Sequence, residues 1–583
     1  MSSFQGALRR TQPLAAIPRA SRQITRHAAR PPGPRSQPPR GRGGKPFGLL
    51  AVFALSAGGY YFYPVLFPKE EKAEIEFEKE RAHPASKEGN RDLISSQHLQ
   101  VRQSWENPGV YAWGSNAGKV IDPNTKETNI KLPRRIAYFD GQILRDIKLT
   151  AKFGAAVTEK GDLVQWGLGF SSDPTPIETL KGKDIVKITV SDERVIALAS
   201  NGSVYSVPSS REDQGPNAPA ETSLWLPFWS SGAGPLPAAS VRNLTPDSLA
   251  WGERVVDVKS GLQHCLLMTS KGRVFSAASS TNEFPSKGQM GVPGLSWTTR
   301  PRGAFDQPHE LLSLKGFHIT GIAAGDHHSV AMDKEGKLFA FGDNTHGQLG
   351  IQPEGGFRTI DVPTLVPVAQ LYTNTGLVPK VTSVAAGGLN TFFTVDASQP
   401  GFHPDSTELV PSRRMPSVTV DTWACGNGVY GSLGNGRWMH VTPAPSKLKA
   451  LSALYEFDEQ ANKMVPIRLS NISVGSTHAA ATMHNVTRTA ASKRTSENDT
   501  NWGYDVLLWG GNEHYQLGTG KRNNLNAPTY IGALDGGSLS DFHRLHLTPR
   551  KTVRLGEDGK GRKATLEQKI ECGRFVTAVY SAA

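Results

Sequence analysis

The chain has 583 residues, of which 38% are hydrophobic and 20% charged, and its formal net charge is +13. Its three cysteines, Cys265, Cys425 and Cys572, are odd in number and have no C-x-x-C spacing, which excludes a disulfide framework. Most of the excess positive charge lies in residues 1–46, so the high pI is weak evidence for nucleic-acid binding by the rest of the chain.

Residues 1–46 contain nine Arg, one Lys and no Asp or Glu. An acid-free, Arg- and Ser-containing N-terminus is typical of a mitochondrial presequence. The alternative is a disordered basic tail without a targeting role, since residues 31–39 are rich in proline. The segment that follows favours the presequence.

Residues 47–67, "FGLLAVFALSAGGYYFYPVLF", are 21 residues without a charge. That length predicts a membrane-spanning helix, with Tyr60, Tyr61 and Tyr63 in an interfacial aromatic belt. Residues 68–100 begin with a charged stretch and are predicted to form a solvated stalk. Because positive charge precedes the anchor, the positive-inside tendency places the part after it in the intermembrane space, with the matrix as the alternative.

The stretch "GDHHSVAMDKEGKLFAFGDNTHGQLG", residues 325–350, allows two interpretations. Asp326, His327 and His328 raise the possibility of a metal or proton-transfer site. However, "HHSVAM" alternates as a strand does, so the two histidines point to opposite faces, and a structural zinc site needs four ligands. Gly336 then marks the turn of a β-hairpin. The alternative is a structural repeat.

The same spacing recurs along the chain, which favours the repeat. His264 and His478 stand where His328 does, while Phe153, Arg194 and Asn390 replace the histidine in other copies. The recurring glycines and histidines are Gly261, His264, Gly272, Gly325, His328, Gly336, Gly342, Gly350, Gly475, His478, Gly510 and Gly518. Seven copies are found, the last split between a strand at Val110–Trp113 and one at Cys572–Tyr580. The spacing predicts an all-β ring of seven blades, closed by pairing these terminal strands.

In this interpretation the glycines serve the architecture, either by positive φ or by close approach of strands. The repeated histidines are buried polar side chains that tie neighbouring strands or blades together by hydrogen bonds. We therefore expect no catalytic, cofactor-binding or metal-binding residues, no cofactor and no enzymatic activity. "GNGVYG" at residues 426–431 matches a dinucleotide fingerprint but lacks the helix which that motif requires.

These motifs, G-x-x-H followed by an aromatic-Gly-x-N and by G-Q-L-G, resemble the regulator of chromosome condensation (RCC-type) repeat. The resemblance covers residues 101–583 and implies a seven-bladed β-propeller. The family includes guanine-nucleotide exchange factors and also binding platforms, so the fold does not fix the activity.

Insertions interrupt the repeat near residues 207–250, 397–420, 484–502 and 537–568, and their polar, Pro/Ser-rich or charged composition predicts surface loops. The first contains Trp225, Phe228 and Trp229, which are candidate anchors for a protein partner. The alternative is that these aromatic residues fold back onto their own blade.

Three functions are compatible with the sequence. The first is a scaffold, anchored in the mitochondrial inner membrane, that assists assembly of a respiratory complex; an anchor joined to a propeller is similar to fungal mitochondrial members of the family linked to the cytochrome bc1 complex (complex III). Its partners would be respiratory-chain subunits or assembly factors, and not nucleic acid. The second is an exchange factor or regulator for a mitochondrial GTPase. The third, a type II secretory-pathway protein with a lumenal propeller, fits the acid-free N-terminus and the lack of a disulfide framework poorly.

Overall fold

The computed structural model describes residues 96–583 except 215–240, 281–282, 296–297, 300–306, 353–357, 400–417, 459–461, 490–499, 537–538, 540–542 and 555–561. The expected presequence (1–46), membrane anchor (47–67) and almost all of the stalk (68–100) therefore lie outside the described residues and remain predictions. Within the described ranges no helix is both long enough and apolar enough to span a membrane.

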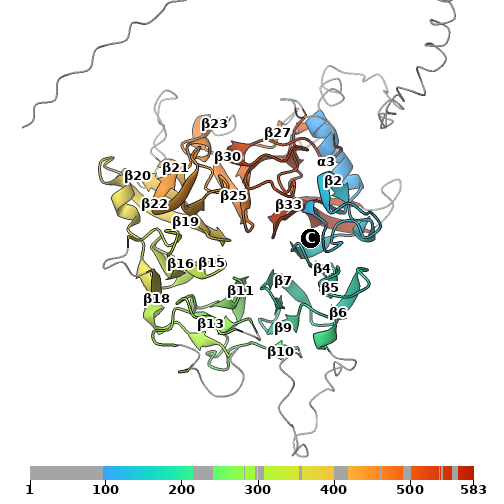
Figure 1. The fold of residues 1–583 in the computed structure, drawn as a ribbon. Coiled ribbons are helices and arrows are strands. Elements are labelled where there is room, and N and C mark those ends of the chain that lie inside the picture. The colour runs from blue at the N-terminus through green and yellow to red at the C-terminus, as the bar shows by residue number, and fades with distance from the viewer. Residues whose placement is uncertain are drawn as a thin grey trace, which may run out of the picture. The chain divides into compact units, whose positions relative to one another are not determined.

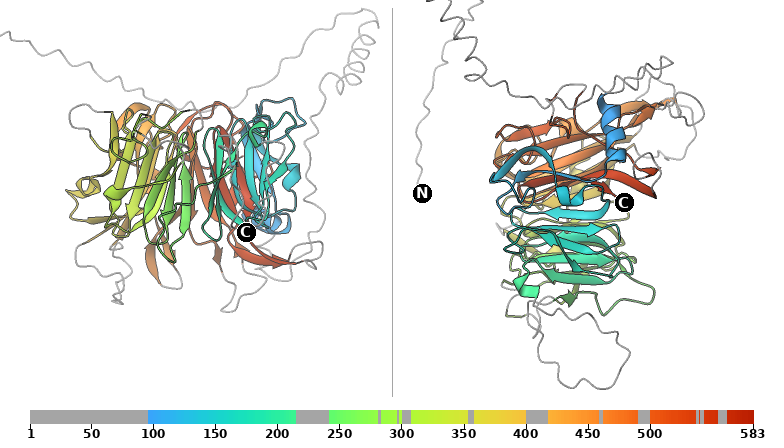
Figure 2. Two further views of the ribbon diagram at one scale, coloured as in Figure 1. Left: turned by 90° about the horizontal axis from the view of Figure 1, so that it is seen from below. Right: turned by 90° about the vertical axis from the view of Figure 1, so that its right-hand side faces the viewer.

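The described chain opens with helix α3 (Ser96–Glu106), so the expected start of the propeller at Val101 falls inside a helix. The strands that follow form a ring of antiparallel sheets (Figure 1). Seen edge-on, the strands run between the two faces of this ring (Figure 2). The fold of the described residues is an all-β propeller.

Five sheets of four or five strands are separate from one another. The four-stranded sheets are β7(Ile185–Val190)–β8(Arg194–Ala199)–β9(Val204–Pro208)–β10(Arg242–Asn243), β11(Val255–Ser260)–β12(His264–Thr269)–β13(Val274–Ala278)–β14(His309–Glu310), β15(Ile319–Ala324)–β16(His328–Asp333)–β17(Leu338–Asp343)–β18(Thr359–Leu365) and β19(Val378–Gly387)–β20(Asn390–Ser398)–β21(Val418–Gly428)–β22(Met439–Lys447). The five-stranded sheet contains β25(Arg468–Val474), β26(His478–His484), β29(Tyr504–Gly510), β30(Leu525–Thr529) and β31(His546–Leu547).

The remaining strands of the ring form one nine-stranded sheet, which corrects the expectation of seven separate blades. It joins β3(Leu144–Leu149)–β4(Gly154–Thr158)–β5(Leu163–Trp166)–β6(Ile177–Leu180) to β32(Lys551–Arg554), β33(Lys563–Cys572), β34(Val576–Ala582), β1(Val110–Ser115) and β2(Asn129–Arg135). The two groups merge because the last strand reaches β3, where Leu144 pairs in parallel with Ala582. The backbone N–H of Ala583 also donates to the carbonyl of Leu144 at 2.9 Å.

The predicted closure of the ring by the two ends of the chain is confirmed. Strand β34 pairs antiparallel with β1, from Val110 opposite Tyr580 to Gly114 opposite Val576. The same strand pairs with β33 on its other side. No long edge of β34 is left open, because both of its neighbours are present.

The hydrophobic core lies between neighbouring sheets of the ring. One cluster, for example, packs Ile196 of β8 and Val204 of β9 against Leu267 of β12 and Phe275 of β13. Burying side chains of this size contributes about 1.5–3 kcal/mol each. A sheet is thus stabilised by its neighbours, as expected of a repeat architecture.

The predicted insertions contain more regular structure than expected. Residues 537–568 hold β31, β32 and the first part of β33, while residues 484–502 hold two short strands, β27(Arg488–Thr489) and β28(Thr500–Asn501). In β33 buried positions alternate with exposed or half-buried ones, which is the period-2 pattern of a strand with one buried face, and the sequence analysis overlooked it. Residues 207–250 include the outer strand β10, and in 397–420 the flanking strands reach Ser398 and Val418.

Candidate functional site

The three repeat histidines each connect two neighbouring sheets. The distance from Nε2 to a hydroxyl oxygen is 2.8 Å for His264 and Ser329, 2.8 Å for His328 and Thr391, and 2.7 Å for His478 and Thr577. In each pair the histidine begins the second strand of one sheet, and the hydroxyl belongs to the next sheet. This is the blade-to-blade contact that the sequence analysis expects.

Each of these hydroxyls is also a donor. Ser329 Oγ donates to the carbonyl of Gln289 at 2.9 Å, Thr391 Oγ1 to that of Gln348 at 2.7 Å, and Thr577 Oγ1 to that of Gln516 at 2.6 Å. Gln348 is the glutamine of the G-Q-L-G motif, and Gln516 stands at the same position of the related Y-Q-L-G. The two halves of the repeat therefore meet in one hydrogen-bonded chain: histidine, hydroxyl of the next sheet, and loop carbonyl of the first sheet.

Burial keeps these histidines neutral. It lowers the pKa of His264 to about 3, that of His328 to about 4 and that of His478 to about 3. In His264 the neighbouring His328 lowers the pKa further. At neutral pH all three imidazoles are uncharged hydrogen-bonding groups, which suits a structural role.

The three residues that raised the possibility of a site at 326–328 do not converge on a common point. His328 contacts Thr391, whereas the carboxylate of Asp326 lies 3.9 Å from Arg574. Burial lowers the pKa of His327, and Lys287 lowers it further. Among the described residues no group of three or more His, Cys, Asp or Glu side chains has the geometry of a metal site.

Two repeat glycines show why their positions exclude a side chain. A Cβ on Gly325 would lie 2.0 Å from Cε1 of His328 and 2.8 Å from the carbonyl oxygen of Gly388 in the next sheet. Gly342 has φ +112°, and its Cβ would lie 2.6 Å from the carbonyl oxygen of His327. The first position therefore requires glycine for close approach, and the second also for its positive φ.

Where the histidine is replaced, the substituted residue is still buried but makes other contacts. Phe153 packs in the core between two sheets. Arg194 donates from Nη2 to the carbonyl of Ser206 at 2.9 Å and from Nε to the hydroxyl of the same residue. These copies lack the histidine-to-hydroxyl contact, so the network is uneven around the ring.

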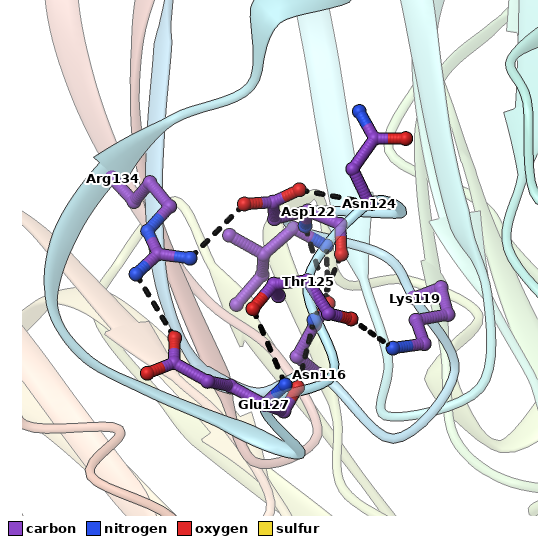
Figure 3. A network of polar contacts seen from close by, with 8 residues as sticks. Asn116, Lys119, Asp122, Asn124, Thr125, Glu127 and Arg134 are labelled. Atoms are coloured by element: carbon purple, nitrogen blue, oxygen red, sulfur yellow. Dashed lines mark hydrogen bonds and ion pairs between the residues drawn. The ribbon is translucent and has the colours of Figure 1, made fainter.

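The asparagine that stands two residues after the aromatic-Gly pair holds the loop that follows it (Figure 3). Asn116 donates to the carbonyls of Asp122 at 3.0 Å and Glu127 at 3.1 Å, and Arg134 forms ion pairs of 3.0 Å with both side chains. Asn344 and Asn512 likewise donate to loop carbonyls, at 2.9 Å and 2.6 Å. The asparagine of this motif thus holds the loop after it in place by hydrogen bonds to the loop backbone.

The candidate partner-binding residues Trp225, Phe228 and Trp229 lie outside the described residues. The described chain resumes at residue 241 and presents Trp251, whose side chain is 98% exposed. The sequence analysis missed this tryptophan because an isolated aromatic residue in a polar loop carries no periodic signal.

The sequence analysis also missed the central channel, a cavity of about 210 Å³ lined by residues of β3, β7, β11, β15, β19, β25 and β33. Its lining includes six charged residues, Lys148, Lys187, Lys259, Asp326, Glu571 and Arg574. Lys148 and Lys259 are each the last residue but one of their strand. That recurrence is the signal that the sequence offers.

Two family models, both described as "Regulator of chromosome condensation (RCC1) repeat", match residues 319–348 and 335–394. The chain is 26% identical over 490 residues to "Protein FMP25, mitochondrial" of Saccharomyces cerevisiae, covering 78% of this chain and 72% of that protein. It is 25% identical over 446 residues to a "Secretion-regulating guanine nucleotide exchange factor" of Mus musculus, covering 73% and 79%. It is 22% identical over 390 residues to "RCC1 domain-containing protein RUG3, mitochondrial" of Arabidopsis thaliana, covering 64% and 71%.

Two solved structures share the fold. Human WBSCR16 aligns with a TM-score of 0.50 and 17% identity, covering 82% of this chain and 99% of that one. Prp20p of Saccharomyces cerevisiae aligns with a TM-score of 0.50 and 16% identity, covering 83% and 94%. At these identities the likeness concerns the propeller fold alone.

Proposed function

We propose that this ring of regulator of chromosome condensation repeats is a mitochondrial binding platform that assists assembly of a respiratory complex, specifically the cytochrome bc1 complex. The likeness over 490 residues to a yeast protein named mitochondrial supports the location, as does the acid-free N-terminus. The repeat histidines are used in hydrogen bonds between sheets, which fits a scaffold rather than an enzyme.

The observation that carries a binding role is the exposure of Trp251. A fully exposed tryptophan is unusual, and tryptophan is enriched among the residues that dominate binding energies at protein interfaces. Trp251 follows directly on the predicted insertion near 207–250, which contains Trp225, Phe228 and Trp229. We propose that these aromatic residues form one contact region for a respiratory subunit or assembly factor.

The proposed location is the inner membrane, with the single helix at residues 47–67 as anchor and the propeller in the intermembrane space. Anchoring confines the platform to the surface where respiratory subunits are inserted and so raises its effective concentration for them. Protease added after rupture of the outer membrane, but not before, should digest the propeller. Protection in both preparations would place the propeller in the matrix.

The function is tested by deleting the gene and separating respiratory complexes on native gels. Loss of assembled bc1 complex and of respiratory growth is expected, and Trp251→Ala should weaken co-purification of partner subunits without changing the amount of the protein. Trp438→Ala is the matched control, because Trp438 is 54% exposed but lies elsewhere on the ring. Normal bc1 complex in the deletion strain would refute the assembly role.

A second candidate is nucleotide exchange on a mitochondrial GTPase. The likeness to the mouse protein named as an exchange factor, which covers 73% of this chain, favours it. Exchange activity would appear as accelerated GDP release from a co-purified GTPase. Its partner capture would depend on added nucleotide, whereas capture of respiratory subunits would not.

A further inference from the structure

The central channel has two unlike walls. Strands β3, β7, β11 and β33 contribute Lys148, Lys187, Lys259 and Glu571 to it. Strands β15, β19 and β25 and the turns that follow them contribute mainly small residues, namely Ala323, Ala324, Gly325, Ala385, Ala386, Gly387, Gly388, Ser473, Gly475 and Ser476. The small side chains leave room in the cavity, and the charged side chains lie on the other wall.

The lysines of the charged wall differ in their partners. Lys148 Nζ lies 2.6 Å from Glu571 and 3.7 Å from Asp146, and Lys187 Nζ lies 2.5 Å from Asp257. Within the described ranges Lys259 has no ion pair or hydrogen bond from its side chain. The two carboxylates that act on Lys259 are Asp257 and Glu571, which pair with Lys187 and Lys148 instead.

The pKa values reflect this difference. Burial acts to lower the pKa of Lys148, but Asp146 and Glu571 outweigh it, so the pKa is raised. The pKa of Lys259 is lowered, first by burial and then by repulsion from Lys187. A half-buried ammonium without a counter-ion is costly, and an anion beside it would remove that cost.

The lining itself contains more cationic than anionic side chains. The cavity is lined by four cationic side chains, Lys148, Lys187, Lys259 and Arg574, against two carboxylates, Asp326 and Glu571. Asp146 and Asp257 oppose Lys148 and Lys187 from outside the lining. Arg574 lies 3.5 Å from Asp192, to which it donates a long hydrogen bond, and 3.9 Å from Asp326.

The opposite wall includes one hydroxyl that is not hydrogen-bonded. Ser476 lines the cavity, and its buried hydroxyl has no partner among the residues that the structure describes. The volume of about 210 Å³ is smaller than the roughly 300–1,000 Å³ usual for drug-sized ligands. A single phosphate or carboxylate group is of suitable size for this cavity.

We propose that the central channel binds a small oxyanion, a phosphate or carboxylate group, through the ammonium of Lys259. The channel is thus a second binding site, separate from the exposed aromatic residues of the proposed platform. It does not depend on which partner the platform binds.

The test uses full-length protein in mild detergent, with sodium phosphate and sodium malonate as probes and sodium chloride of equal ionic strength as reference. The midpoint of thermal unfolding of the native protein should rise with phosphate, malonate or both, and the rise should saturate. A rise with phosphate identifies a phosphate site, and a rise with malonate identifies a carboxylate site. The rise should persist in Lys259→Arg and disappear in Lys259→Met. Lys463→Met, at an exposed lysine of the hairpin β23(Tyr455–Asp458)–β24(Lys463–Pro466), should behave as the native protein does.

A second measurement needs no variant. An amine-reactive reagent is applied to the native protein, and modification of each lysine is followed by mass spectrometry. Anion present at about ten times its Kd should slow modification of Lys259 about tenfold and leave that of Lys463 unchanged. An equal rise of the midpoint in Lys259→Met, no rise with either anion in the native protein, or unchanged modification of Lys259 would each overturn the proposal.

Discussion

Nε2 of His328 in β16 lies 2.8 Å from Oγ1 of Thr391 in β20, across the boundary between two sheets. Since the single hydroxyl proton of Thr391 is donated to the carbonyl of Gln348, its oxygen accepts from His328, which must therefore carry its proton on Nε2. The same argument holds for His264 with Ser329 and for His478 with Thr577. One tautomer thus serves the three described copies of the contact.

Removing this contact should weaken the ring. His328→Ala leaves the hydroxyl of Thr391 without its donor and is expected to lower the free energy of unfolding by about 1–3 kcal/mol. His328→Asn, which introduces the residue that the next copy has at Asn390, should cost less. Urea unfolding of the purified protein measures both. Stoichiometric zinc in the native protein, released by His328→Ala, would contradict the structural role.

The stability should fall with acid because these histidines are buried in the neutral form. Their pKa is about 3–4 in the folded chain and about 6.5 in the unfolded chain, so below pH 6.5 the unfolded state binds protons that the folded state does not. The full contribution is present above pH 6.5 and is lost as the pH falls toward 4, at up to about 1.4 kcal/mol per pH unit for each histidine.

The comparison that isolates this effect is native protein against His328→Asn at pH 7.5, 6.5, 5.5 and 4.5. The difference in unfolding free energy between the two should shrink as the pH falls. His484→Asn, at an exposed histidine of β26, is the control for replacing a histidine outside the core. A constant difference for His328→Asn would mean that His328 can be protonated in the folded chain.

Close approach of neighbouring sheets predicts a large cost for a single methyl group. Gly325→Ala would place Cβ against the ring of His328 and the backbone of Gly388, and overpacking of this kind costs about 1–3 kcal/mol. Gly141→Ala is the control, since Gly141 has φ +73° but nothing within 4 Å of the added Cβ. A smaller loss of thermal stability in Gly325→Ala than in Gly141→Ala would refute the packing argument.

Closure of the ring predicts that the C-terminal strand is indispensable. Deleting residues 576–583 removes the partner of β1 and of β33, so two strand edges become unpaired. The truncated protein should aggregate or be degraded, as judged by its soluble yield and its unfolding profile. Deleting residues 403–410, in the predicted insertion near 397–420, removes the same number of residues and should leave the ring folded. A soluble, cooperatively unfolding 1–575 chain would show that closure is dispensable.

Local spacing in the sequence was sufficient to predict the repeat, the hairpins and the closure of the ring. A hairpin turn such as that at Gly336 and the alternation in "HHSVAM" depend on neighbours within a few residues, and the pairing of β1 with β34 follows from a copy split between the chain ends. The structural role of His328 could be predicted because the residue recurs where a catalytic group would not. Most of strand β33 was overlooked, although its buried and outward residues alternate with the period of a strand.

Tertiary structure alone decided what the repeats enclose and how they join. The merging of two groups of strands at Leu144 and Ala582 depends on where the last strand ends in space. The same is true of Lys259, which is separated from Lys148 and Glu571 by more than a hundred residues and meets them only in the channel. Spacing within a repeat determines a blade, but the ion pairing and burial of a side chain on the axis depend on every blade that faces it.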